Sequence, residues 1–376
     1  MNEVSILTHS FLDAYNGNID RIYGGGLERY LHEICGMIAE LGWKPVIYQL
    51  SYCGDFEKEI GFIRVHGYDC NHRDSIEVFN RMTIEAKGPI IYSSFIWEAI
   101  EYKAGSLGIC HGINWDYHAA SAEHKAEVGR NIQHALGHLK RIVSVDSHFL
   151  TFCRAVCQYP DPDQIVLLPN AVDTAWYTPG TRWRGLQRKE ETIRIVYPRR
   201  VSLERGIIPM MLVADRLLQN YPQVHIEFAG EVINNNLITK AFRQWMDSSP
   251  DRDRIIHRCY TFQEMNEAYQ KADIAVIPTV FSEGTSYSCL EAMSCGLPVV
   301  AGNVGGLNDL IINGYNGFTV APTEEKLYEC IASLVENSEL RHYVGANARA
   351  VAHAFDIRIW REKWKEILCS YLEQEV

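Results

Sequence analysis

Two glutamates, Glu283 and Glu291, lie eight positions apart and enclose the small polar run Gly-Thr-Ser-Tyr-Ser at 284–288. An apolar stretch at 274–280 predicts a strand, FSEG at 281–284 predicts a turn, and the pattern from Thr285 to the closing Gly296 predicts a helix. The first amides of a helix lack intrahelical acceptors and attract anions, whereas carboxylates repel phosphate and accept hydrogen bonds from hydroxyls. This combination suits a ligand that carries both phosphates and hydroxyls, such as a nucleotide-sugar.

A second interpretation of these residues is a capped turn beside a solvated glutamate. For either glutamate alone it is the better interpretation, because exposed glutamates and Ser/Thr caps are common. The whole strand, turn and helix, followed by EAMSCGLPVVAGNVGG at 291–306, favours a functional site. The residues expected to bind the anion and its ligand there are Gly284, Thr285, Ser286, Tyr287 and Ser288, flanked by Glu283 and Glu291.

Short apolar runs alternate with amphipathic helical patterns along the chain and supply elements that could position this site. Runs buried on both faces are typical of parallel strands, so the pattern predicts doubly wound α/β units that bind ligands at the carboxyl ends of their strands. The first series of expected strands is 4–10, 44–50, 88–95, 107–113, 141–147 and 164–170. The second series is 192–200, 225–231, 254–260, 274–280, 298–303 and 317–322.

The interval 173–192 contains Pro, Gly, Arg and Trp without any period, which predicts a linker. At 376 residues the chain is too long for one ordinary core. We therefore predict an N-terminal Rossmann-like domain at 1–175 and a C-terminal Rossmann-like domain at 176–356. An amphipathic helix is expected over 357–376.

Composition and charge argue against several classes of protein. A formal net charge of −11 is unlike a general nucleic-acid binder, and no apolar run approaches the ~18 residues of a membrane span. The eleven cysteines are scattered without a C-x-x-C pair, which favours reduced thiols in a cytoplasmic protein. A local basic stretch at 124–141 leaves peripheral contact with the inner face of a membrane open.

The segment SEGTSYSCLEAMSCGLPVVAGNVGGLNDLI at 282–311 resembles the E-x7-E signature of retaining, family 4-type glycosyltransferases of the GT-B fold. Weaker similarities follow the family's order over most of the chain, at 23–42, 169–179, 197–207, 228–231 and 313–322. The resemblance implies two Rossmann-like domains that face each other across a cleft, with the final helix packing back on the first.

The resemblance also implies an activity. The enzyme would transfer a hexose from a nucleotide-diphosphate sugar, by default a UDP-sugar such as UDP-glucose, to a hydroxyl of a sugar or lipid-linked glycan. Configuration at the anomeric carbon would be retained, and the reaction would belong to polysaccharide or glycoconjugate biosynthesis. The second domain would bind the donor and the first domain the acceptor.

In the second domain the resemblance implies a role for each matched residue. Glu283 accepts hydrogen bonds from hydroxyls of the donor sugar, and Glu291 binds the ribose. The element YPRRVSLERGI resembles the family's G-R-L-x-x-x-K-G, so Arg200 and Arg205 neutralise the diphosphate leaving group; for either arginine alone, a surface ion pair is the alternative. Arg205 replaces the usual lysine, keeping the charge and adding a bidentate fork. Gly230 ends the strand that resembles A-G-x-G and would also contact the donor.

In the first domain, three glycines match the family's glycine-rich start and would let backbone approach a donor phosphate, with a flexible turn as the alternative: Gly24, Gly25 and Gly26. His111 matches the family histidine that faces the reacting sugar, although a lone histidine is more often structural. The residues expected to line the acceptor are Asn114, Trp115 and Asp116. Trp115 would stack on a sugar face, and core packing is an equal alternative.

The implied chemistry depends on stabilising negative charge on the leaving diphosphate. The family reaction is described as front-face, with the leaving phosphate assisting deprotonation of the acceptor hydroxyl. No metal and no cofactor are expected, because no D-x-D run near these motifs is flanked by strand signals and DPD at 161–163 is interpreted as a turn. Two alternatives stay open: a nucleotide-sugar epimerase on the same fold, and a non-catalytic nucleotide-sugar-binding subunit.

Overall fold

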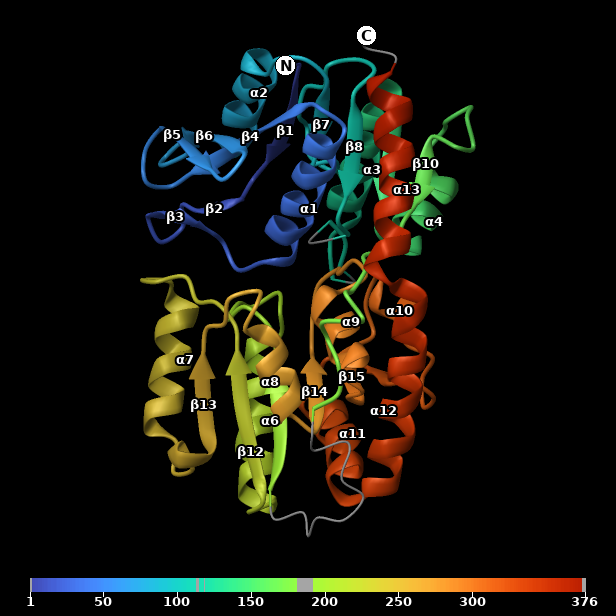
Figure 1. Cartoon of the computed structure of the whole chain (residues 1–376). Coiled ribbons are helices and arrows are strands. Elements are labelled where there is room, and N and C mark those ends of the chain that lie inside the picture. Colours follow the sequence, from blue (N-terminus) through green and yellow to red (C-terminus); the bar gives the residue numbers. More distant parts are fainter. Residues whose placement is uncertain (1, 113–114, 118, 181–191, 374–376) are drawn as a thin grey trace. The chain divides into compact units, whose positions relative to one another are not determined.

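The computed structural model describes residues 2–112, 115–117, 119–180 and 192–373 (Figure 1). The chain divides into two compact units, one formed by Met1–Pro169 with Ile359–Val376 and the other by Asn170–Arg358. Each unit is built around its own largely parallel β-sheet with helices between the strands. This confirms the predicted α/β class with two doubly wound units.

The described part of unit 1 contains an eight-stranded sheet in the order β10-β9-β8-β7-β1-β4-β6-β5. Its strands are β1 (Glu3–Thr8), β4 (Lys44–Ser51), β5 (Phe56–Ile60), β6 (Ile63–Asp69), β7 (Ile90–Tyr92), β8 (Leu107–Cys110), β9 (Arg141–Ser144) and β10 (Ile165–Leu167). Every neighbouring pair is parallel except β5 with β6. A separate hairpin pairs β2 (Leu12–Asp13) with β3 (Asn18–Ile22). The sequence did not predict β2, β3, β5 or β6.

The helices of unit 1 are α1 (Gly26–Glu40), α2 (Ser75–Glu85), α3 (Ala122–His138) and α4 (Ser147–Val156). The C-terminal helix α13 (Ile357–Leu372) packs against α1 of the same unit from Ile359 onward. The indole Nε1 of Trp364 donates to the hydroxyl of Tyr30 at 2.9 Å, and Arg361 donates to Glu40 at 2.6 Å. The hydroxyl of Tyr371 donates to the carbonyl of Ile90 at 3.0 Å. These contacts join the two ends of the sequence in one unit.

Unit 2 contains a six-stranded parallel sheet in the order β13-β12-β11-β14-β15-β16. Its strands are β11 (Ile193–Tyr197), β12 (Val224–Ala229), β13 (Ile255–Arg258), β14 (Ile274–Ile277), β15 (Val299–Gly302) and β16 (Phe318–Val320). The spatial order is 3-2-1-4-5-6, the doubly wound arrangement whose strand order reverses between the first and fourth strands. Ligands bind outside the carboxyl ends of the strands at that reversal, which here lies between β11 and β14.

The helices of unit 2 are α6 (Ile207–Asn220), α7 (Leu237–Ser248), α8 (Met265–Lys271), α9 (Tyr287–Ser294), α10 (Leu307–Leu310), α11 (Glu324–Glu336) and α12 (Ser338–Ala352), with short 3-10 turns at Arg252–Arg254 and His353–Phe355. Two apolar clusters lie on the sheet of this unit. One gathers the buried residues of α6, α7 and α11, and the other those of α8 and α9. Because α9 is anchored by its buried residues Cys289, Leu290 and Met293, its first turn is held firmly at the strand reversal.

The boundary between the units lies earlier than the expected division after residue 175. The segment that follows Pro169 bonds within unit 2, because the amide of Val172 donates to the carbonyl of Phe355 at 2.9 Å. Tyr177 is also buried in the unit 2 core. The expected linker at 173–192 therefore begins as part of unit 2, and its residues 181–191 lie outside the described residues.

None of the helices in the described residues is both long enough and apolar enough to cross a bilayer. The sequence prediction of peripheral membrane contact is not tested by this structure. All eleven cysteines, each of which lies in a described part of the chain, are free thiols.

Candidate functional site

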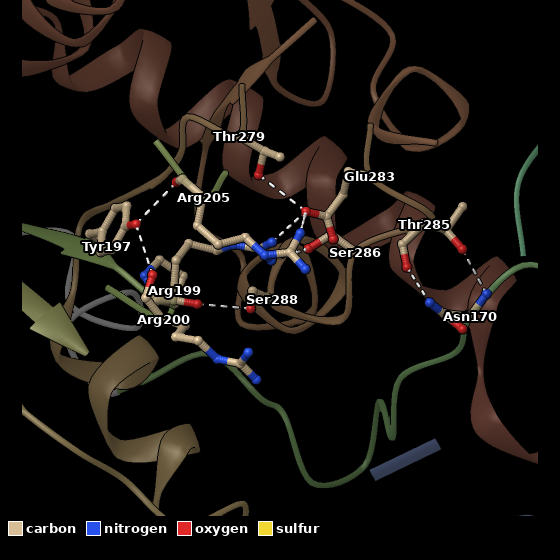
Figure 2. Close-up of polar contacts among 11 residues, drawn as sticks. Asn170, Tyr197, Arg199, Arg200, Arg205, Thr279, Glu283, Thr285, Ser286 and Ser288 are labelled. Carbon is tan, nitrogen blue, oxygen red and sulfur yellow. Dashed lines mark hydrogen bonds and ion pairs between the residues drawn. The ribbon is translucent and has the colours of Figure 1, made fainter. Parts of the chain in front are cut away.

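The loops that leave β11 and β14 meet at the strand reversal of unit 2, and there Glu283 receives two guanidinium groups (Figure 2). Arg199 and Arg205 both donate to its Oε2 atom, and the hydroxyl of Thr279 donates to the same atom at 3.2 Å. The side chains of Arg199, Glu283 and Arg205 are 8%, 7% and 18% exposed. We call Arg199, Arg205 and Glu283 the arginine–glutamate cluster.

The loop after β11 is held in place by Tyr197 and by two glycines. The hydroxyl of Tyr197 donates to the carbonyls of Arg200 and Arg205, at 3.2 Å and 3.0 Å. At Gly206, where φ is +77°, a Cβ atom would lie 1.9 Å from the carbonyl oxygen of Pro278. At Gly230, a Cβ atom would lie 2.0 Å from the carbonyl oxygen of Arg199. Gly230, predicted as a donor contact, therefore lets β12 end directly against the arginine loop.

The loop after β14 places the start of α9 beside Arg199. Ser286 is the N-cap residue of α9, and its hydroxyl accepts a hydrogen bond from Nη1 of Arg199 at 2.9 Å. The hydroxyl of Ser288 donates to the carbonyl of Pro198 at 2.9 Å. The helix begins at Tyr287, so the expected start at Thr285 was two residues early. The positive end of the α9 dipole therefore faces the same loop as the arginines.

Asn170 fixes the residues that precede α9. Its amide donates to the hydroxyl of Thr285 at 2.8 Å, and its side-chain Nδ2 donates to the carbonyl of Thr285 at 2.6 Å. Gly284 is buried between Glu283 and Thr285. These bonds hold Thr285 outside the helix, which is consistent with the later helix start at Tyr287.

Glu291 lies in the second turn of α9, and its side chain is bonded to a tyrosine. The hydroxyl of Tyr269, on α8, donates to Oε2 of Glu291 at 2.9 Å. Burial, and then the nearby Glu291 carboxylate, raise the pKa of Tyr269 well above its ordinary value. Tyr269 therefore stays a hydrogen-bond donor and orients Glu291. The ribose role of Glu291 stays a prediction.

The arginine–glutamate cluster carries excess positive charge in a buried place. Burial lowers the pKa of Arg205 to about 10; Glu283 opposes this shift, and the charges of Arg199 and Arg200 add to it. Arg200 is half-buried, and in Figure 2 its side chain extends away from Glu283. A buried cation without a matching anion is costly, so this arrangement favours an anionic ligand.

Arg199 is the residue that sequence reasoning missed. In the pattern G-R-L-x-x-x-K-G its position corresponds to the first glycine, so the resemblance assigned roles only to Arg200 and Arg205. The structure instead brings Arg199 and Arg205 onto Glu283. The sequence signal for Arg199 was the pair of adjacent arginines at 199–200. Successive side chains of an extended chain point to opposite sides, so the two arginines were expected to point in different directions.

In unit 1 the predicted residues lie in two places. Gly26 is the first residue of α1 and Gly25 is its N-cap, with Gly24 directly before them. His111 follows β8 and is 9% exposed; its Nε2 atom lies 2.9 Å from the hydroxyl of Ser93, which follows β7. The glycines' contact with a donor and the role of His111 in the reaction stay predictions.

Of the three residues predicted to line the acceptor, one lies outside the described residues and one is buried in the core. Asn114 lies outside the described residues. Trp115 is 2% exposed and stacks on His148 at a ring distance of 4.8 Å, so its indole packs in the core and does not offer a face to a sugar. Asp116 is 34% exposed, and its Oδ2 atom lies 3.0 Å from Nε2 of His148.

The protonation of His111 gives a testable pH dependence. Burial, and then the charge of His9, lower the pKa of His111 from 6.5 to about 3 in the folded protein. The unfolded chain therefore binds a proton below pH 6.5 that the folded protein does not, and the stability linked to this residue falls as pH falls. Between pH 6.5 and 5, urea unfolding should show wild type losing up to roughly 1.4 kcal/mol per pH unit relative to His111→Gln. Parallel pH profiles for the two proteins would contradict this expectation.

Among the described residues, no group of three or more His, Cys, Asp or Glu side chains could hold a metal ion. The groups at this site that can donate hydrogen bonds to an anion are the guanidinium groups and the first amides of α9. The site as described can bind a phosphate-bearing ligand and can stabilise negative charge that develops on it.

The chain is similar to known proteins in sequence and in fold. Residues 182–351 match the sequence family described as Glycosyl transferases group 1. Glycogen synthase of Mycobacterium tuberculosis (strain ATCC 25618 / H37Rv) is 26% identical over 233 residues, which cover 56% of this chain and 52% of that protein. The chain thus spans about half the length of the curated relatives it matches.

Two solved structures resemble the whole chain. Sucrose-phosphate synthase from Thermosynechococcus elongatus matches with a TM-score of 0.77 and 15% identity, covering 100% of both chains. HepE from Anabaena, solved in complex with UDP-glucose, matches with a TM-score of 0.68 and 17% identity, covering 98% of this chain and 100% of that one. At these identities the similarity establishes the fold, which is that of GT-B glycosyltransferases.

Proposed function

We propose that the protein transfers a hexose from a nucleoside-diphosphate sugar to a hydroxyl of a sugar or glycolipid acceptor, because residues 182–351 match the family described as Glycosyl transferases group 1. The observation that carries this proposal is the arginine–glutamate cluster at the strand reversal of unit 2, beside the start of α9. It combines cations for phosphate with a carboxylate for sugar hydroxyls.

Each part of the site has a role in this proposal. Arg205 and Arg200 hold the diphosphate together with the first amides of α9, and Glu283 accepts hydrogen bonds from the hydroxyls of the hexose. Glu291, oriented by Tyr269, accepts hydrogen bonds from the ribose. The donor is a UDP-sugar such as UDP-glucose, which the UDP-glucose complex of HepE supports for a related fold.

The reaction exchanges one bond at the anomeric carbon. The C1–O bond to the diphosphate breaks, and its electron pair stays on the phosphate oxygen, where Arg205 and the helix amides stabilise the charge. The acceptor oxygen forms the new bond to C1 from the same face, and its proton passes to the leaving phosphate oxygen. Configuration is therefore retained without a protein nucleophile.

The free thiols support a reducing, cytoplasmic location.

The experiment that tests the proposal is a turnover assay with UDP-, GDP- and ADP-glucose, with and without a panel of sugar and glycolipid acceptors. One nucleotide series should release nucleoside diphosphate, and an acceptor should yield a glycoside with the donor's anomeric configuration. An epimerised sugar in place of a glycoside would support the epimerase alternative. Binding of a donor without turnover on any acceptor would support a non-catalytic subunit.

A further inference from the structure

Arg199 stands out because it shares its carboxylate partner with a second arginine. Its Nη2 atom and Nη1 of Arg205 both donate to Oε2 of Glu283. Its side chain is 8% exposed, and its Nε atom is buried with no hydrogen-bond partner among the described residues. A guanidinium has five N–H donors, so Arg199 is only partly satisfied where it lies.

Stability alone does not explain this arrangement. Desolvating a second guanidinium is costly, and a buried ion pair is often no more stabilising than apolar side chains of the same volume. Arg205 already supplies a counter-ion for Glu283. The second guanidinium is therefore better explained by what it does to the geometry and charge of the site.

The other contact of Arg199 concerns the start of α9. Nη1 donates to the hydroxyl of Ser286 at 2.9 Å, and this N-cap residue makes no side-chain capping bond to the described amides of the helix. A serine at the N-cap ordinarily accepts from those amides. Arg199 thus engages both the carboxylate and the capping hydroxyl with one rigid fork (Figure 2).

The charges of the site fit a diphosphate only when Arg199 is counted. Three arginines, at 199, 200 and 205, and one glutamate, Glu283, leave two positive charges, which equals the two negative charges of a nucleoside-diphosphate sugar. Without Arg199, the carboxylate would cancel a charge needed for the phosphates. With it, a carboxylate can lie beside a diphosphate.

We propose that Arg199 is a positioning residue of the donor site: it fixes the Glu283 carboxylate toward the sugar of the donor and keeps the Ser286 hydroxyl off the amides that bind the distal phosphate. This inference rests on the proposed function. Arg199 acts through Glu283 and Ser286, and it distinguishes a nucleoside-diphosphate sugar from the free nucleoside diphosphate.

Two variants separate the charge of Arg199 from its geometry. Arg199→Lys keeps the charge and loses the planar fork, so it cannot reach Glu283 and Ser286 together. Arg199→Leu loses both. Arg194→Leu is the matched control, because Arg194 lies near the start of β11, at the end of the strand away from the loop that carries Arg199. For each protein, kcat and KM are measured with UDP-, GDP- and ADP-glucose, and Kd is measured with UDP, GDP and ADP.

For Arg199→Lys, we expect kcat with the donor to fall about 10- to 100-fold, because a misplaced carboxylate no longer orients the sugar. Its Kd for the nucleoside diphosphate should stay within about threefold of wild type, since the charge is kept. Arg199→Leu should lose both kcat and diphosphate affinity, and Arg194→Leu should match wild type. If Arg199→Leu fails to fold, Arg199→Lys alone decides the matter.

A wild-type kcat in Arg199→Lys would overturn the inference, because charge alone would then suffice. A lowered melting temperature with an unchanged kcat would also overturn it, since the role of Arg199 would be structural. A wild-type protein that neither binds nor turns over any of these donors would overturn the proposed function and this inference with it. An active wild type with unaffected Arg199 variants would overturn this inference alone.

Discussion

Arg205→Ala is expected to lower kcat for sugar transfer by about 100- to 1,000-fold, the usual effect of removing one donor that stabilises charge in a transition state. Arg205 is bonded to Glu283 in a place where burial lowers its pKa to about 10, so its charge is poorly solvated and available to an anion. Steady-state kinetics with the active nucleotide-sugar measure the change. The decrease in kcat should not be offset by a decrease in KM of the same size, since the lost interaction acts on the leaving group in the transition state.

Arg205→Lys is the matched control for this prediction. Lysine is the residue that the resembling sequence pattern carries at this position, and it keeps the positive charge. It should retain most of the activity that Arg205→Ala loses. If Arg205→Ala kept a kcat close to that of wild type, Arg205 would not contact the leaving diphosphate.

Glu283→Gln is expected to destabilise the protein by about 3–5 kcal/mol, because removing one partner of a buried ion pair leaves the other charge uncompensated. Here two guanidiniums, those of Arg199 and Arg205, lose their shared carboxylate. The change keeps the size of the side chain, so the loss reports charge rather than packing. Urea unfolding of wild type and variant measures the difference in free energy.

The double variant Arg199→Leu/Glu283→Gln provides the control for this second prediction. It removes one cation together with the anion, and it should recover part of the lost stability, since the excess charge is smaller. Inorganic pyrophosphate should stabilise Glu283→Gln more than wild type, because it replaces the missing negative charge. Equal stability of wild type and Glu283→Gln would show that the cluster is not a buried ion pair.

Much of the fold was predictable from local pattern. The strands of the parallel sheets are short apolar runs buried on both faces, and each central strand was predicted within a few residues of its observed bounds. The missed strands are β5 and β6, at the edge of the unit 1 sheet, and the hairpin β2–β3. In β5 half-buried and exposed positions alternate, so its sequence, FEKEI, lacks the continuous apolar run used to recognise the others.

The site was predictable only where its residues are close in sequence. Glu283, Glu291 and the residues around the start of α9 follow from one continuous motif. The pairing of Arg199 with Glu283 and of Asn170 with Thr285 joins residues far apart in the chain, and no periodicity encodes such contacts. Trp115 shows a second limit of sequence-based prediction. An indole can stack on a sugar or pack in a core, and only the burial of Trp115 in the structure decides between the two roles.

The measurement that tests the account most directly is thermal stabilisation of wild type by UDP, GDP, ADP and their glucose conjugates, with Glu291→Ala alongside. Glu267→Ala, an exposed glutamate on α8, is the matched control. A ligand at about 100 times its Kd should add ~2.7 kcal/mol to the free energy of unfolding. We predict stabilisation by one nucleotide series in wild type and Glu267→Ala, and its loss in Glu291→Ala. An absence of stabilisation by every nucleotide would contradict a nucleotide-sugar site in unit 2.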